Sequence, residues 1–295
     1  MSSVDISVII PHYDQESELR LCLKSLVEQS ASNLSYEIIV ADNDTPGGIE
    51  TIKKSFPTVT FVTALQKGAA CARNAAMEIA IGRNFAFIDA DCIAHPDWLL
   101  HGRKSLENSD LVGGHVKVTI ENELAPSAVE AFEQVFAFRQ QRYIEQKQFS
   151  VTANLFVSAI NARKIGPFKN GVSEDIEWCH RARALGFHLV FDGKSIVSHP
   201  ARRQWGELVS KWDRMISEHW NGYGGQELSR QLKWAGLAIV TAFSIAPHTV
   251  RILTSGKLPS LKSRIGAALV LVRIRCWRAI KMFSVLFASQ ASSSE

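Results

Sequence analysis

Short apolar, β-branched runs alternate with helical patterns along the N-terminal part of the chain. The strand-like runs occupy residues 6–10, 36–41, 58–63 and 84–88. Between them, apolar residues recur with helical spacing over residues 16–29, 48–55 and 68–81. This alternation is typical of βαβ units, whose parallel sheet is covered by helices on both faces. The pattern therefore predicts an α/β fold with a mostly parallel sheet flanked by helices.

The pattern after residue 125 is less regular. The predicted elements are a helix at 126–148, a strand at 152–159, a helix at 173–185, and short strands at 188–191 and 195–198. A glycine-rich stretch at 222–225 then marks a change of composition, which is typical of a domain edge. We therefore expect one domain over residues 1–225 and a helical tail over residues 226–295.

The first apolar stretch of the tail covers residues 234–250, which include no Asp, Glu, Lys or Arg. Its length lies at the lower limit of the roughly 17 to 25 residues that a bilayer-spanning helix needs. Pro247 also interrupts its end. Whether this stretch spans a membrane stays open.

The second apolar stretch, residues 266–288, has clearer helical periodicity. Six apolar residues recur there at spacings of three and four: Leu269, Val272, Cys276, Ile280, Phe283 and Phe287. Arg275, Arg278 and Lys281 fall mainly on the other side, so the pattern predicts a basic amphipathic helix. Such a helix can pack on the first domain or lie in the surface of an anionic membrane. Further apolar residues, Trp277 among them, widen the stripe and favour the membrane.

Charge is distributed unevenly along the chain. Residues 200–295 carry 14 Lys and Arg against 5 Asp and Glu, whereas residues 1–199 carry 19 against 24. An acidic N-terminal part suits a cation site, and a basic tail suits an anionic surface. Because the basic residues of the tail are mixed with apolar ones, we expect a membrane partner and no nucleic acid. The five cysteines lack Cys-x-x-Cys spacing, which argues against a zinc cluster and a disulfide framework.

Three predicted strands end in polar segments. Pro11-His12-Tyr13-Asp14 follows the first strand, Asp42-Asn43-Asp44 follows the second, and Asp89-Ala90-Asp91 follows the fourth. Ligands of open α/β sheets bind beyond the carboxyl ends of the strands. We therefore expect the three loops to converge on one site.

Asp89 and Asp91 leave the end of their strand close together, so their carboxylates repel each other unless a cation lies beside them. Mg²⁺ or Mn²⁺ would relieve this repulsion and could also hold a diphosphate. Two other interpretations stay open. One acid could cap the helix that begins near Pro96. The pair could also belong to a phosphotransferase with an aspartyl nucleophile, although such pairs typically follow the first strand.

Five short motifs occur in an order that resembles a known enzyme family. They are Val8-Ile9-Ile10-Pro11, Val40-Ala41-Asp42-Asn43-Asp44, Lys67-Gly68-Ala69-Ala70-Cys71-Ala72-Arg73-Asn74, Asp89-Ala90-Asp91 and Ser173-Glu174-Asp175. Together they resemble the inverting glycosyltransferase family two over roughly residues 5 to 215. The resemblance implies a GT-A, Rossmann-like fold. It also implies transfer of a sugar from a nucleotide-sugar, which we expect to be a UDP-sugar, to an acceptor hydroxyl with inversion.

The resemblance implies a donor-binding site. Its expected residues are Pro11, His12, Tyr13, Asp42, Lys67, Gly68, Arg73, Asn74 and Asp89. Asp42 would read the uracil edge, although its segment is also a good turn sequence. Arg73 and Asn74 open a helix and could face the diphosphate or the sugar hydroxyls. The family usually has Gly or Ser where Asp44 stands.

The resemblance also implies the metal ligands and the catalytic base. Asp89, Asp91 and His199 would hold Mg²⁺ or Mn²⁺. Glu174 and Asp175 occupy the position of the base, so Asp175 would take the proton of the attacking hydroxyl while the metal and Arg73 neutralise the leaving diphosphate. A purely structural alternative is a helix N-terminus with acids in its first turn.

The sequence thus predicts a divalent-metal-dependent glycosyltransferase that acts on a lipid-linked or polysaccharide acceptor. The polar N-terminus lacks the apolar segment of a signal peptide, which predicts a location at the cytoplasmic face of the cell membrane, with the tail on the membrane surface. The alternative is a non-catalytic nucleotide-sugar-binding or scaffold subunit of a membrane glycan-assembly complex. Such a subunit would have no need for Asp175.

Overall fold

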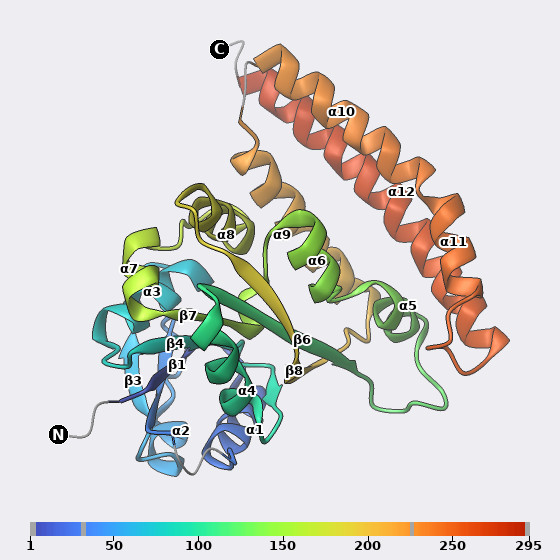
Figure 1. Cartoon of the computed structure of the whole chain (residues 1–295). Coiled ribbons are helices and arrows are strands. Elements are labelled where there is room, and N and C mark those ends of the chain that lie inside the picture. The colour runs from blue at the N-terminus through green and yellow to red at the C-terminus, as the bar shows by residue number, and fades with distance from the viewer. Residues whose placement is uncertain (1–3, 31–33, 225–226, 293–295) are drawn as a thin grey trace. The chain divides into compact units, whose positions relative to one another are not determined.

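The computed structural model describes residues 4–30, 34–224 and 227–292 (Figure 1). The chain divides into two compact units, one of residues 1–117 and 138–199 and the other of residues 118–137 and 200–295. The predicted boundary between residues 225 and 226 lies outside the described residues. The predicted domains therefore stay a prediction. The structural units differ from them, because residues 118–137 and 200–225 belong to the second unit.

The central sheet has eight strands in the order β3-β2-β1-β4-β7-β6-β8-β5. The strands are β1 (Ile6–His12), β2 (Tyr36–Asp42), β3 (Thr60–Thr63), β4 (Asn84–Phe87), β5 (Ile93–Ala94), β6 (Leu111–Thr119), β7 (Leu155–Ser158) and β8 (Leu189–Pro200). Strands β3, β2, β1 and β4 run parallel, whereas β7 is antiparallel to β4 and β6, and β5 is antiparallel to β8. The sheet is therefore mixed, and the predicted mostly parallel arrangement is limited to its first four strands.

The sequence pattern did not predict the antiparallel part of the sheet, for two reasons. Strand β7 is preceded by helices, as a parallel strand would be. Strand β6 contains Gly113 and Gly114, which weaken a strand pattern. The structure explains both glycines, because a Cβ on Gly113 would lie 2.5 Å from Ser150 Oγ and one on Gly114 would lie 2.3 Å from Asn154 Nδ2. The two short strands predicted at 188–198 form the single strand β8.

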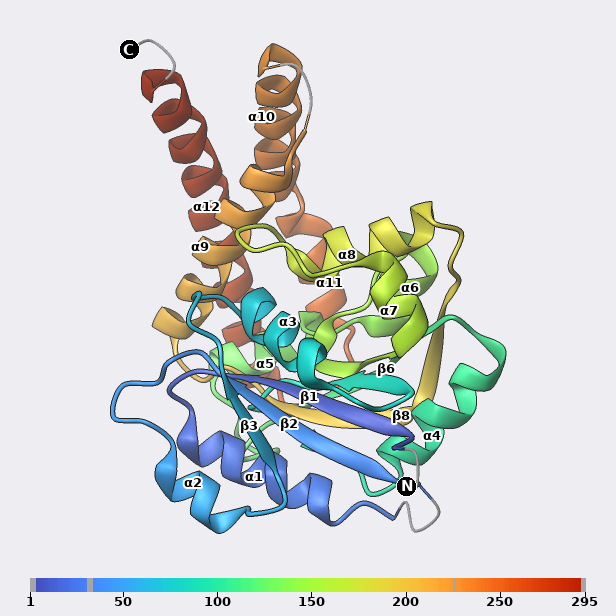
Figure 2. The same ribbon diagram turned by 90° about the vertical axis from the view of Figure 1, so that its left-hand side faces the viewer.

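Helices cover both faces of the sheet (Figure 2). The helices of this unit are α1 (Glu16–Val27), α2 (Glu50–Ser55), α3 (Ala69–Ile79), α4 (Trp98–Ser105), α6 (Gln140–Lys147), α7 (Ala159–Ile165) and α8 (Glu174–Ala184), with the 3₁₀ turns η1 (Leu106–Asn108) and η2 (Thr152–Asn154). Side chains alternate along β1, so Val8 and Ile10 pack with α1 and α4 while Ile9 packs with α3 and α8. Because helices bury both faces of the sheet, a polar ligand can reach it only at the ends of the strands.

The helix predicted at 126–148 is two helices, α5 (Ala128–Phe136) and α6. A capping box between Ser127 and Glu130 starts α5. At its end Ala137 turns to extended backbone, and Phe138 takes a φ of 45°, in the left-handed region. A non-glycine residue there carries steric strain, and the sequence has no glycine or proline to announce this break.

The second unit is helical. It contains α5, α9 (Trp205–Gly222), α10 (Glu227–Phe243), α11 (Ile245–Leu253) and α12 (Leu261–Ser292). Phe132 of α5 and Leu208 of α9 pack with Leu271 and Ile274 of α12 in one apolar cluster. Trp220 of α9 packs with α10 and α12 in another cluster. The tail helices therefore share their core with segments from two earlier parts of the sequence.

Helix α12 buries a different face from the predicted one. The predicted stripe is largely exposed: Leu269, Val272, Cys276, Ile280 and Phe287 face outward. The buried face carries Ala267, Val270, Leu271, Ile274, Met282 and Leu286 instead. Because α12 has apolar residues on several faces, periodicity could not decide which face meets the protein. The predicted amphipathic tail is therefore not confirmed in the form expected.

The described residues include one stretch that could cross a membrane by length and composition, Leu228–Leu253, with a mean hydropathy of 1.4 and 17% of its window buried. The stretch is not one continuous helix, because α10 ends at Phe243 and α11 begins at Ile245. Pro247 lies in the first turn of α11, where its missing N–H leaves no hydrogen bond unmade.

Candidate active site

The carboxyl ends of β1 and β2 meet at a hydrogen-bonded pair, His12 and Asp42, which are also register partners in the sheet. His12 Nε2 accepts the backbone N–H of Gln15 at 3.2 Å. The ring proton therefore lies on Nδ1, which donates to Asp42 Oδ1 at 2.8 Å. The structure thus brings together two of the predicted donor-site residues.

Asp42 is also the first residue of a turn. The backbone N–H of Thr45 donates to its Oδ2 at 3.0 Å, and Thr45 Oγ1 donates to its Oδ1 at 2.6 Å. Burial alone would raise the pKa of Asp42, but the bonds from Thr45 and His12 lower that pKa below its usual value. Asp42 is therefore ionised at neutral pH, and the turn interpretation of its segment describes real contacts.

Asn43 organises the loop before α3. Its Oδ1 accepts the N–H of Gly68 at 2.6 Å, and its Nδ2 donates to the carbonyls of Ala64 and Gln66 at 2.8 Å each. Sequence reasoning did not assign Asn43 any role. Asn has the donor and acceptor that such a loop needs, but which loop it would hold depends on the fold.

The Lys67-Gly68 segment is fixed from a second side by Asn170, whose Nδ2 donates to the carbonyl of Lys67 at 2.8 Å. Gly68 has a φ of 126°, and a Cβ there would lie 2.2 Å from Asn170 Oδ1, so only glycine fits. The ammonium group of Lys67 lies 5.8 Å from the ring centroid of Tyr13. Three predicted donor-site residues, Tyr13, Lys67 and Gly68, therefore belong to neighbouring loops.

Arg73 lies at the centre of the site and joins two of its carboxylates. Its Nη2 donates to Asp89 Oδ1 at 2.8 Å and its Nη1 to Glu174 Oε1 at 3.0 Å. The Arg73 side chain is 4% exposed, against 33% for Asp89 and 19% for Glu174. Arg73 is therefore committed to protein carboxylates, which differs from the expectation that it faces the diphosphate.

Asn74 is likewise occupied by the protein. Its Nδ2 donates to the carbonyl of Phe168 at 2.9 Å, and its Oδ1 accepts the N–H of Phe168 at 2.8 Å. The side chain thus joins α3 to the segment that precedes α8. Because its Nδ2 and Oδ1 both bond to the backbone of Phe168, Asn74 holds that segment against α3.

Asp91 and His199 approach each other at the other side of the Asp-Ala-Asp loop. Asp91 Oδ2 lies 3.2 Å from His199 Nε2, and the His199 ring packs on Phe138 with the ring centroids 4.5 Å apart. Among the described residues, no three His, Cys, Asp or Glu side chains come together closely enough to form a metal site. Asp89 Oδ1 accepts from Arg73, whereas Asp91 and His199 contact each other, so the predicted three-residue ligand set stays a prediction.

Asp175 occupies the first turn of α8 beside Glu174. Thr152 Oγ1 donates to its Oδ1 at 2.8 Å. Ser173 precedes the helix but makes no side-chain cap bond, so the structural alternative is only partly met. Burial raises the pKa of Asp175 to about 7, with the Glu174 charge adding to the rise and Arg73 opposing it. Such a carboxyl group can exchange a proton near neutral pH.

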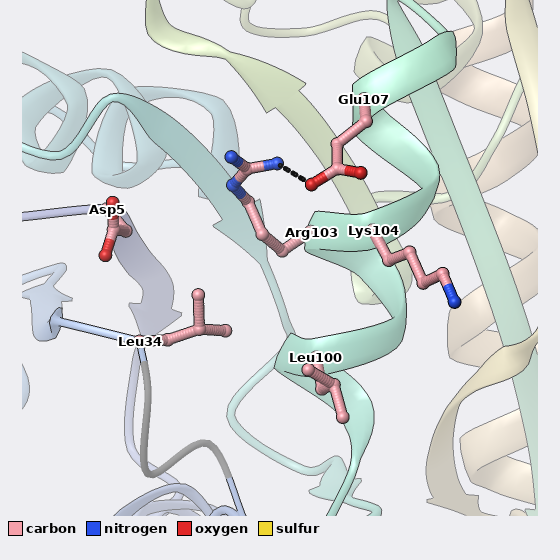
Figure 3. Close-up of a pocket in the computed structure, with 6 residues that line it drawn as sticks. All are labelled: Asp5, Leu34, Leu100, Arg103, Lys104 and Glu107. Carbon is pink, nitrogen blue, oxygen red and sulfur yellow. Dashed lines mark hydrogen bonds and ion pairs between the residues drawn. The ribbon is translucent and has the colours of Figure 1, made fainter.

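A cavity of about 440 Å³ lies elsewhere, between Asp5, Leu34, Leu100, Arg103, Lys104 and Glu107 (Figure 3). Asp5 directly precedes β1, so this cavity is at the amino end of the strand, opposite to His12. None of the predicted site residues lines it. The strand-end cluster is the better candidate because it combines the acid pairs and the loops.

The mixed sheet, the helices on both faces and the polar loops at the strand ends define a GT-A-like fold. The sequence profile of glycosyl transferase family 2 matches residues 7–164. The chain belongs to this family and is a glycosyltransferase.

Two relatives illustrate the family. Glycosyltransferase AglE of Haloferax volcanii is 32% identical over 219 residues, which is 71% of each chain. UDP-Glc:alpha-D-GlcNAc-diphosphoundecaprenol beta-1,3-glucosyltransferase WfgD of Escherichia coli is 33% identical over 91 residues, 30% of this chain and 35% of that protein.

Among solved structures, a mannosyltransferase from Pyrobaculum calidifontis in complex with GDP-Man and Mn²⁺ is similar with a TM-score of 0.59. The match covers 98% of this chain and 88% of that one at 14% sequence identity. At this identity the likeness concerns the fold alone.

Proposed function

We propose that the protein transfers a sugar from a UDP-sugar to an acceptor hydroxyl with inversion, with Asp175 as the general base. The observation that carries this proposal is the position of Asp175 in the first turn of α8, bonded to Thr152 and next to the network of Arg73, Asp89 and Glu174, where burial raises its pKa to about 7. A base works best when its pKa lies near the working pH. A non-catalytic binding subunit would gain nothing from a desolvated carboxylate at this place.

The pair Asp91 and His199 fits one divalent cation, Mg²⁺ or Mn²⁺. A carboxylate and an imidazole suit Mn²⁺, and such ions usually complete their shell with water and substrate phosphates. When bound, the ion would supply positive charge opposite the leaving diphosphate. Arg73 holds Asp89 and Glu174 in place, and Asp175 accepts the proton of the attacking hydroxyl.

The donor would lie over the strand ends. His12 and Asp42 would face the uracil base, and the Lys67-Gly68 segment would pass beside the diphosphate. The E. coli relative named above acts from UDP-Glc on a lipid diphosphate, which supports a UDP-sugar donor and a lipid-linked acceptor. A polysaccharide acceptor would use the same base.

The acceptor would be reached at the cytoplasmic face of a membrane, to which the C-terminal helices attach. Residues 228–294 carry ten Lys and Arg and no Asp or Glu, and large apolar side chains are exposed on α10, such as Phe243 at 78%, and on α12, such as Ile280 at 70%. Arg273, Arg275 and Arg278 in the middle of α12 would be costly inside the bilayer. We therefore propose that α12 lies on the membrane surface and does not cross it.

The donor and the metal can be tested together. Binding of UDP-, GDP- and dTDP-sugars is measured by calorimetry with and without Mn²⁺, and we expect tight binding of a UDP-sugar only with the metal. Asp91→Asn keeps the shape and removes the charge, so it should weaken Mn²⁺-dependent donor binding about tenfold or more. Exposed Glu28→Gln is the matched control for the loss of one acid. Unchanged donor binding in Asp91→Asn would contradict the metal assignment.

A further inference from the structure

The helical unit contains two half-buried arginines, Arg275 and Arg278, that have no counter-charge among the described residues. Arg275 and Arg278 lie three residues apart on α12, on neighbouring turns of one face. Neither guanidinium group has a carboxylate within ion-pair distance among the described residues. The Nε atoms of both side chains are buried and have no hydrogen-bond partner.

The surroundings of the two arginines include two other helices of the unit, α9 and α11. The guanidinium carbon of Arg278 lies 3.5 Å from the ring centroid of Trp212 on α9. Arg275 Nη2 lies 3.3 Å from His248 Nδ1 on α11. The indole Nε1 of Trp212 is also buried without an acceptor. The cluster therefore offers several donors and positive charges, and His248 Nδ1, which accepts from Arg275, is neutral and supplies no counter-charge.

Partial burial lowers the pKa values of both arginines, because desolvation disfavours the charged guanidinium group. The pKa of Arg278 falls to about 9 because its side chain is desolvated and because Arg275 repels it. Desolvation also lowers the pKa of Arg275. Burying a guanidinium group without an anion is unfavourable even when it stacks on an aromatic ring. The stack on Trp212 offsets only a part of this cost.

The neighbours of the cluster show that the chain can pair charges here. Lys281, one turn further along α12, pairs with Asp213 of α9 at 2.7 Å. Arg273 stacks on Trp205 of α9 with its guanidinium carbon 3.9 Å from the ring centroid, and its side chain is exposed to water. Arg275 and Arg278 thus differ from both neighbours, since they have neither a carboxylate nor full hydration.

We propose that Arg275 and Arg278, with Trp212 and His248, form a binding site for the phosphate group of a lipid. A phosphate offers several acceptor oxygens and a negative charge, and planar guanidinium groups match it well. We infer that the phosphate belongs to a lipid, because α12 also carries exposed apolar residues such as Leu269 and Val272. The site goes beyond the proposed transferase activity, and it gives the proposed membrane attachment a specific contact.

The experiment uses the full chain and three Arg→Met variants, which keep an unbranched side chain and remove the charge. Arg278→Met and Arg275→Met change the cluster, and Arg273→Met is the matched control on the same helix. Binding is measured to vesicles of phosphatidylcholine alone and to vesicles with phosphatidic acid. Melting temperatures are measured with and without inorganic phosphate.

We expect the parent to prefer phosphatidic acid vesicles, and Arg278→Met to lose about tenfold or more of that preference. Arg273→Met should lose only a small, salt-sensitive part. Without phosphate, Arg278→Met should melt at a higher temperature than the parent, because an unpaired buried charge has been removed. A lower melting temperature with unchanged vesicle preference would show that Arg278 only stabilises the helices and would overturn the proposal.

Further results distinguish the lipid-phosphate site from the proposed membrane attachment and from the catalytic proposal. Stabilisation by inorganic phosphate without a preference for phosphatidic acid would overturn the lipid assignment. Binding to phosphatidylcholine vesicles reports apolar attachment, so its absence would contradict the proposed membrane attachment. Sugar transfer to a soluble acceptor, measured with the same variants, tests the catalytic proposal separately.

Discussion

Arg73 is buried and Arg278 is half-buried, and the charges around them differ. Burial alone would lower the pKa of Arg73, but Asp89 and Glu174 raise that pKa above its usual value. Arg278 has no such partner, and burial together with Arg275 lowers its pKa to about 9. Arg73 is therefore compensated by carboxylates of its own unit, whereas Arg278 lacks such a partner among the described residues, although the same helical unit pairs Lys281 with Asp213.

This difference indicates what each region does with its charge. In the strand-end site the carboxylates are held in fixed positions, as a reaction requires. In the helical unit the anion that we propose for Arg278 would come from outside the chain. We therefore interpret Arg73 as a residue that positions carboxylates and Arg278 as a residue that binds an external anion.

The largest expected effect lies on the catalytic side, at Asp175. Because this carboxylate would touch the acceptor and not the donor, Asp175→Asn should reduce turnover on the order of 10² to 10⁴-fold and leave donor affinity nearly unchanged. Asn can still accept the bond from Thr152 Oγ1, so the fold should persist. Turnover and donor affinity are measured on the same purified protein. Full activity in this variant would remove Asp175 from the mechanism.

The two arginines themselves provide the next test, because the same substitution should act in opposite directions. Arg73→Met leaves Asp89 and Glu174 without a partner and should lower the free energy of unfolding by about 3 kcal/mol, the low end for a buried pair, since Asp89 is 33% exposed. Arg278→Met should leave stability unchanged or raise it. Denaturant unfolding measures the free energy of unfolding of both variants. If both variants lost the same amount, the contrast between Arg73 and Arg278 would be wrong.

The pH dependence of activity and stability should have opposite signs. The pKa of Asp175 rises from 3.8 to about 7 on folding. Below about pH 4 its protonated form contributes full stability, which is lost as the pH rises through about 7. Activity needs the ionised form, so kcat/KM should fall about tenfold per pH unit below 7. Asp175→Asn should remove this contribution to the pH dependence of stability. A rate profile with its acid limb near pH 4 would contradict the assignment.

Much of the strand-end site was predictable from local sequence. Parallel strands place their carboxyl ends at one edge, so Asp42 and Asp89 could be assigned to that edge from the pattern alone. The partners of these side chains could not be predicted. Arg73 reaches Glu174 across 101 positions of sequence, and its choice of protein carboxylates over a ligand depends on the packing of α3 against α8.

The helical unit was less predictable for a related reason. Helix α5 lies between β6 and β7 in the sequence and packs with α12, a long-range contact that no local pattern encodes. Helix α12 has apolar residues on several faces, so the face that packs was decided by Phe132 and Leu208 on other helices. Charge content was readable from the sequence, but the missing counter-charge was not.

The smallest expected effect concerns Asp42, whose charge is shared among several donors. His12, the Thr45 hydroxyl and the Thr45 N–H already bond to its carboxylate, which leaves one acceptor direction of about four for a base N–H. Asp42→Ala should therefore weaken uridine diphosphate binding by about 1 kcal/mol, roughly fivefold, the size of one hydrogen bond.

The control for Asp42 is Thr45→Val, which removes the hydroxyl donor and keeps the carboxylate. It should disturb the turn while binding of uridine diphosphate falls less than in Asp42→Ala. Guanosine diphosphate distinguishes the two roles, because a base-reading carboxylate should matter more for uracil than for guanine. If Asp42→Ala weakens both nucleotides equally, Asp42 belongs with Arg73 among the paired charges that only shape the loops.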